Sequence, residues 1–113
     1  MGLFSRFRRK GAGDPRRVDG PDMLVDVKAV QAHFANFVQT RRGVEAYVEP
    51  ATNVTAVSVI LIATDGEWTR RALGSRRTAF ELAQSLQIPV YDVNLTGYPN
   101  RMRVWNSRQR KRG

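Results

Sequence analysis

The chain contains no cysteine among its 113 residues, which excludes disulfides, thiolate metal ligands and a cysteine nucleophile. This absence is typical of a reducing compartment, and we expect a cytoplasmic protein. Long apolar runs are also missing. The longest one, 57–63, is interrupted by Ser58 and falls far short of the ~20 residues that span a bilayer. Met1 leads directly into basic residues, so we expect no secretory signal.

Side chains suited to catalysis are scarce. His33 is the only histidine, so no histidine pair can bind a metal, and we expect it on the surface of a helix or partly buried there. The chain has neither a G-x-G-x-x-G motif nor a P-loop. No two carboxylates have a spacing that predicts acid–base catalysis. We therefore expect no metal or cofactor, and an enzyme is the least favoured hypothesis.

Positive charge is concentrated at the two ends of the chain. Residues 1–17 contain six Lys/Arg and one acid, and residues 101–113 contain six Lys/Arg and no acid. Between them, residues 18–100 contain seven Lys/Arg and nine acids, within a total net charge of +9. This distribution predicts a nearly neutral folded core with cationic ends that bind a polyanion.

The chain divides accordingly into three predicted parts. Glycine and proline interrupt residues 1–21, and no apolar periodicity follows Phe7, so we expect a disordered basic arm there. Residues 22–97 are expected to form a single α+β domain. Residues 98–113 are expected to form a flexible basic tail. A helix that starts after an Asn100 cap is the alternative for this segment.

The hydrophobic pattern predicts the element order α-β-β-β-α-β. Apolar residues at three- and four-residue steps predict the helices, and alternating or β-branched runs predict the strands. The expected elements are helices at 23–42 and 76–87 and strands at 44–49, 54–64, 67–73 and 89–93. We expect a three-stranded antiparallel meander with a two-residue turn at Asp65-Gly66, one short extra strand, and helices on one face. Asp22 is a candidate cap of the first helix, and Gly43 a candidate stop.

A cluster of basic residues surrounds the predicted start of the second helix. Free N–H groups at a helix start attract anions, whereas arginines there run against the usual dipole preference. The residues of this candidate phosphate site are Arg70, Arg71, Ser75, Arg76 and Arg77. The alternative interpretation, that these arginines are solvated surface residues, stays open.

The same region resembles the second half of a double-stranded-RNA-binding domain. The resemblance rests on residues 57–62, 65–67, 72–77, Ala79 and 83–86. It implies an α-β-β-β-α topology and a basic pair, here Arg76 and Arg77, that meets RNA phosphates at the start of the last helix. Such domains bind RNA by its shape and backbone.

A wider stretch, about 44–103, resembles a family of small actinobacterial proteins. The resemblance rests on residues 43–50, 65–71, 89–93 and 97–103. It implies no activity, although some members carry an oxidoreductase label, and no motif in this chain supports that chemistry.

The C-terminal segment combines cations with one tryptophan. Its basic residues, which are candidates for phosphate contacts, are Arg101, Arg103, Arg108, Arg110, Lys111 and Arg112. Trp105 has two possible roles. It can stack on a base, or, with Met102 three residues earlier on a helix, it can pack on the core, which is the interpretation we favour.

The N-terminal segment offers a competing function. Three apolar residues share one face of a short helix there, with cations around them, so it could lie on an anionic membrane. The residues concerned are Leu3, Phe4, Phe7, Arg8 and Arg9. The alternative is a disordered basic arm.

The leading hypothesis is a non-enzymatic protein that binds nucleic acid, with structured RNA or a ribonucleoprotein favoured, through phosphate contacts. A peripheral membrane or protein–protein adaptor is the alternative. The oligomeric state is left open.

Overall fold

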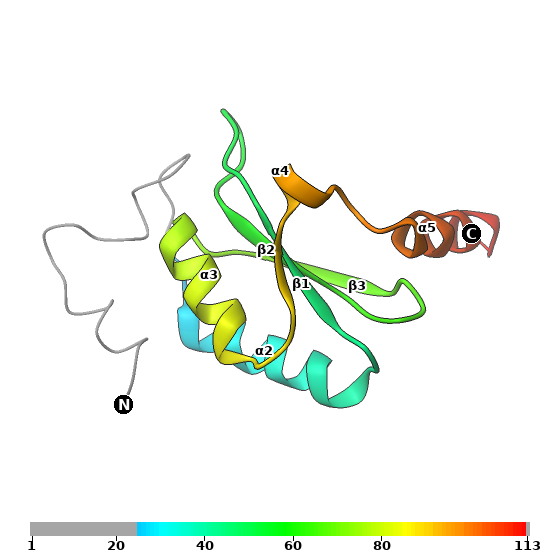
Figure 1. The fold of residues 1–113 in the computed structure, drawn as a ribbon, viewed down its shortest axis with the longest axis horizontal. Coiled ribbons are helices and arrows are strands. Elements are labelled where there is room, and N and C mark those ends of the chain that lie inside the picture. Colours follow the sequence, from blue (N-terminus) through cyan, green and yellow to red (C-terminus); the bar gives the residue numbers. More distant parts are fainter. Residues whose placement is uncertain (1–24, 113) are drawn as a thin grey trace, which may run out of the picture.

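A computed structural model of the protein describes residues 25–112, the side chain of Arg112 excepted. It is an α+β fold, as the sequence predicts (Figure 1). Its elements are α2 (Val27–Thr40), β1 (Glu45–Glu49), β2 (Ser58–Ile62), β3 (Trp68–Ala72), α3 (Arg76–Ser85), β4 (Val90–Asp92), α4 (Val93–Thr96) and α5 (Asn100–Arg112). Among these residues, no helix combines the length and apolarity needed to cross a bilayer.

The sheet has four strands in the order β3-β2-β1-β4. β1, β2 and β3 form the predicted antiparallel meander. β4 adds beside β1 in the parallel direction, with Tyr47 opposite Tyr91. The predicted order α-β-β-β-α-β is confirmed up to β4.

One face of the sheet packs against α2 and α3 and holds the main core. Phe34 of α2 and Leu82 of α3 are fully buried there against Val48 and Leu61 of the central strands. Helix α2 begins at Val27 after the cap Asp26, whose side chain accepts a hydrogen bond from the backbone of Ala29. The helix therefore begins four residues later than the predicted start at residue 23, and the predicted cap, Asp22, lies outside the described residues.

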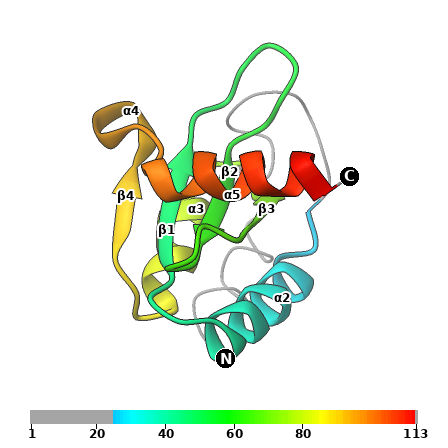
Figure 2. The same ribbon diagram turned by 90° about the vertical axis from the view of Figure 1, so that its right-hand side faces the viewer.

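The C-terminal segment is a docked helix rather than a flexible tail, in agreement with the helical alternative and with the favoured packing of Met102 on the core. Residues 100–112, predicted as part of a basic tail, form α5, and α5 packs on the face of the sheet opposite α2 and α3 (Figure 2). Met102 is the buried anchor of this contact, beside Tyr47, Ile60 and Ile62. Because helices cover both faces, every residue of β2 is buried.

The element boundaries differ from the predictions at a few positions. β2 begins at Ser58 rather than at residue 54, because residues 50–57 form a loop. A five-residue connection, 63–67, joins β2 and β3 in place of the predicted two-residue turn at Asp65-Gly66; in it the Ala63 N–H donates to the Glu67 carbonyl and Gly66 has φ +94°. Gly43 has the left-handed φ of +60°, but α2 already ends at Thr40.

Candidate nucleic-acid interface

Specific polar contacts fix the first half of α5 on the sheet. The Arg101 Nε donates to the Ala63 carbonyl at 2.8 Å, and its Nη2 pairs with Glu45 at 2.6 Å. The Trp68 indole N–H donates to the Asn106 side chain at 2.8 Å. These contacts run from β1 to β3, so α5 crosses the strands as a fixed helix (Figure 2).

A close backbone approach also holds α5 to the hairpin. A Cβ added at Gly66 would lie 2.0 Å from the Arg101 carbonyl oxygen and 2.8 Å from the Trp105 Cβ. Only glycine therefore fits between the hairpin and the helix. Trp105 is partly buried at this contact, in agreement with the interpretation that it packs on the core.

The outer side of α5 is cationic. Arg103, Arg108, Arg110 and Lys111 are all exposed, and none of them pairs with an acid within residues 25–112. Arg103 lies seven residues before Arg110 and eight before Lys111, so these three project from one side of the helix. The helix contains no acidic residue. Its surface can therefore accept several phosphates along one line.

Arg70 occupies a different environment from the other members of the predicted cluster. Its Nε and Nη2 donate to the two carboxylate oxygens of Glu49 at 2.7 and 2.8 Å. The Ser58 hydroxyl donates to the same carboxylate at 2.6 Å, and the Tyr98 hydroxyl forms a further short hydrogen bond with it. Glu49 is 7% exposed, so this four-donor cluster forms a polar centre on the α5 face.

The ionisation of Glu49 follows from this arrangement. Burial raises the pKa of Glu49, but the hydrogen bonds from Arg70, Ser58 and Tyr98 outweigh burial and hold the pKa below its ordinary value. Burial and the hydrogen bond to Glu49 raise the pKa of Tyr98. At neutral pH the cluster is thus an ionised carboxylate that accepts four hydrogen bonds from three side chains, those of Arg70, Ser58 and Tyr98.

Arg71 lies on the opposite face of the sheet, because neighbouring residues of a strand alternate. Its Nη1 donates to the Arg70 carbonyl at 2.7 Å. His33 of α2 lies nearby, with its Nε2 2.7 Å from the Thr69 hydroxyl. Burial and then the charges of Arg71 and Arg41 lower the pKa of His33. His33 is partly buried on a helix, as predicted.

The start of α3 is occupied by internal contacts. Ser75 is 1% exposed and caps the helix by accepting from the Thr78 N–H at 3.1 Å. Arg76 pairs with Asp92 at 2.5 Å and lies over the Phe80 ring, 4.7 Å from its centroid. Arg77 pairs with Glu81 at 3.7 Å. The structure therefore places the predicted cluster on two faces, with three of its arginines in ion pairs.

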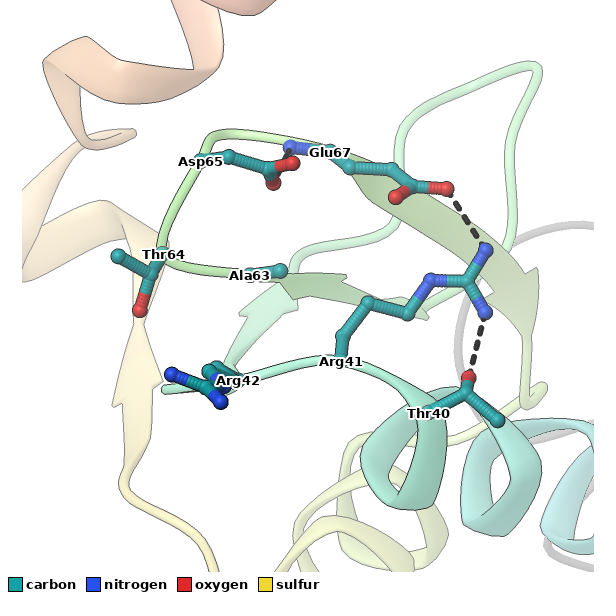
Figure 3. A pocket seen from close by; sticks show the side chains of 7 residues that line it. All are labelled: Thr40, Arg41, Arg42, Ala63, Thr64, Asp65 and Glu67. Atoms are coloured by element: carbon teal, nitrogen blue, oxygen red, sulfur yellow. Dashed lines mark hydrogen bonds and ion pairs between the residues drawn. The ribbon is translucent and has the colours of Figure 1, made fainter.

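A cavity of about 540 Å³ lies between the end of α2 and the β2–β3 hairpin (Figure 3). Arg41 reaches across it and pairs with Glu67 at 2.7 Å. The cavity also contains Asp65, and its wall includes the C-terminal end of α2, where free carbonyls carry partial negative charge. These groups disfavour a phosphate here, despite the exposed Arg42.

The membrane hypothesis concerns residues that lie outside the described part of the chain. They are Leu3, Phe4, Phe7, Arg8 and Arg9. Among residues 25–112, no three His, Cys, Asp or Glu side chains gather as a metal site.

Comparisons of the chain with protein-family models, with curated proteins and with solved structures yield no match. What the protein does is therefore inferred from the charges and geometry of its own residues.

Sequence reasoning missed the polar centre around Glu49. Its members come from β1, β2, β3 and the 97–99 connection, so no local motif joins them. A signal was present in the alternation of Glu45, Tyr47 and Glu49, which predicts one shared face for these residues. It does not predict that a helix covers that face.

Proposed function

We propose that the protein binds nucleic acid through phosphate contacts along the outer side of α5, with structured RNA favoured. The observation that carries this proposal is the set of exposed cations Arg103, Arg110 and Lys111 on one side of α5, with Arg108 farther round the helix, none of which has an acidic partner within residues 25–112. A phosphate backbone that meets them releases its condensed counterions, and this release drives binding.

The docking of α5 supports the same proposal. A flexible basic tail loses conformational entropy when a polyanion orders it, whereas α5 is already held by Arg101, Met102 and Asn106. The cations near its C-terminal end also suit the helix dipole, so they do not destabilise the free protein. The interface is thus preformed.

The arginines of the folded core contribute less to the proposed interface than the cations of α5. Arg70, Arg76 and Arg77 each pair with a carboxylate, and a phosphate would have to compete with Glu49, Asp92 or Glu81. These arginines are secondary contacts in the proposal.

The test compares two double variants that remove the same charge, Arg103→Gln/Arg110→Gln and Arg76→Gln/Arg77→Gln. Binding of a hairpin RNA is measured by fluorescence anisotropy over a range of salt concentrations. We expect the α5 variant to weaken binding and to reduce the slope of log K against log[salt] by about two. The α3 variant should reduce the slope by less than about one.

Equal losses in the two variants would contradict an interface on α5, because generic charge attraction depends on net charge rather than on position. Unchanged RNA binding in both, together with loss of binding to anionic vesicles on deletion of residues 2–10, would favour the membrane hypothesis.

A further inference from the structure

A second cavity, of about 400 Å³, lies where the parallel strands β1 and β4 end. Pro50, directly after β1, and Val93 and Asn94, directly after β4, line it. The chain leaves β1 into the loop 50–57 and leaves β4 into α4, so the two exits diverge (Figure 2). A crevice outside the carboxyl ends of parallel strands is the common ligand position in open sheets.

The floor of this cavity is rigid and nearly neutral. Glu49 accepts from Ser58, from Tyr98 and twice from Arg70, so its carboxylate has no capacity left for a ligand. The charges of Glu49 and Arg70 offset each other. A doubly charged phosphate therefore gains little here, unlike on α5.

Polar side chains on the walls reach solvent. The Arg70 guanidinium binds Glu49, interacts with Tyr98 and lies over the Trp68 ring, 5.1 Å from its centroid, and the Arg70 side chain is 42% exposed. The Asn94 side chain is exposed and makes no hydrogen bond within this part of the chain. Pro50, Val93 and Tyr98 add apolar surface.

These groups match an uncharged planar ring with acceptors on its edge. Arg and Asn are the side chains that most often pair with base edges, and an aromatic ring such as that of Tyr98 stacks on an unpaired base. The volume lies within the range of ligand pockets lined by apolar groups with a few polar ones.

We propose that this cavity binds one unpaired nucleobase of an RNA whose phosphates lie on α5. The proposal rests on the proposed function, since it needs RNA held on α5. The connection 97–99 leads from α4 directly to α5, and four residue steps span at most roughly 14 Å. The cavity therefore neighbours the start of α5, and Arg110 and Lys111 lie roughly 15 Å farther along the helix, a distance of a few nucleotides. An RNA that reaches both presents a loop or bulge rather than a continuous duplex.

The test uses Asn94→Leu in the full chain, with Leu95→Asn as its matched control. Leu95 is 84% exposed and is adjacent in sequence, but it does not line the cavity. Two RNAs with equal numbers of phosphates are compared, a hairpin with an unpaired loop and a blunt duplex. We expect the wild type and Leu95→Asn to bind the hairpin roughly tenfold more tightly, and Asn94→Leu to lose this preference with its salt slope unchanged.

A direct measurement uses the four free nucleosides and the NMR signals of the Asn94 side-chain amide and the Tyr98 ring. Shifts that saturate with one nucleoside and vanish in Asn94→Leu support the proposal. Equal binding of both RNAs by the wild type, or a hairpin preference that survives in Asn94→Leu, would overturn the base site while leaving phosphate binding on α5 intact. Loss of RNA binding in the α5 double variant supports the phosphate contacts on α5, and the base site is decided separately by the comparison of the wild type with Asn94→Leu.

Discussion

The two faces of the sheet are built from alternate residues of the same strands, yet they are closed by different forces. On the α2/α3 face, apolar side chains such as Phe34, Leu61 and Leu82 pack into one continuous core. On the α5 face, a small apolar cluster around Ile60 and Met102 is flanked by ion pairs and by the polar centre of Glu49.

The α2/α3 face therefore supplies most of the stability, whereas the α5 face positions the polar groups of the proposed binding sites. Burial of apolar surface is non-directional and supplies most of the free energy of folding. Hydrogen bonds to a buried carboxylate supply less net energy, but they fix the positions of the groups that donate them. The α5 face therefore holds Arg70, Tyr98 and α5 in place, and both proposed binding sites lie on it.

The largest contrast is expected between a core residue from each face. Phe34→Ala should lower the free energy of unfolding by about 3–5 kcal/mol, because it opens a cavity in the α2/α3 core. Met102→Ala should cost about 2 kcal/mol, at the low end for such changes, since Met102 is 9% exposed at the edge of α5. Chemical denaturation measures both. A larger loss for Met102→Ala would contradict the ranking of the two faces.

Two glutamates of β1 test whether the polar centre dominates the α5 face. Glu49→Ala removes the shared acceptor of Arg70, Ser58 and Tyr98 and should cost about 2–3 kcal/mol. Glu45→Ala removes the partner of Arg101, but the Glu45 side chain is 28% exposed against 10% for Glu49, so about 1 kcal/mol or less is expected. Urea unfolding compares the two variants. Equal losses would mean that burial of Glu49 adds nothing.

Two glycines with positive φ separate backbone strain from helix docking. Gly97→Ala should cost about 1–3 kcal/mol through backbone strain alone, because φ 68° and ψ −175° lie in a region essentially restricted to glycine and nothing lies within 4 Å of the new Cβ. Gly66→Ala should cost roughly 1–2 kcal/mol more, because its Cβ would meet the Arg101 carbonyl at 2.0 Å. Trp68 contacts α5 and Trp105 belongs to it, so their fluorescence should change in Gly66→Ala and stay the same in Gly97→Ala.

The smallest effect concerns pH. Since the folded-state pKa of Glu49 is lowered, its contribution to stability is complete above the ordinary glutamate pKa of about 4.3 and is lost as the pH falls through the folded value. Glu49→Gln should therefore flatten the part of the stability curve below about pH 4.3. If the free energy of unfolding of this variant falls with decreasing pH as steeply as that of the wild type, the acid sensitivity belongs to other carboxylates.

Much of the fold could be predicted from local patterns. The meander, a short fourth strand, and the stripes of α2 and α3 follow from apolar spacing within single elements, whereas the parallel direction of β4 was not predicted. Residues 54–57 were predicted as strand, because Val54 and Thr55 are residue types that favour strands. In the structure they belong to the loop 50–57, and Val54 is 84% exposed.

The site was less predictable. The arginines of the proposed phosphate cluster are adjacent in sequence, but strand alternation sends Arg70 and Arg71 to opposite faces. Conversely, Glu49 and Tyr98 are far apart in sequence and meet only after the strands pair. Charge content alone does not distinguish a paired arginine from a free one.

The sequence by itself determined the element order, the cationic ends and the apolar stripe that each helix buries, because these depend on neighbours along the chain. Only the tertiary structure decided that the C-terminal cations stand on a docked helix and that most core arginines are already paired. The physical reason is that electrostatic and hydrogen-bond partners act over a few ångströms in space, and the strand pairing brings together residues that are distant in sequence.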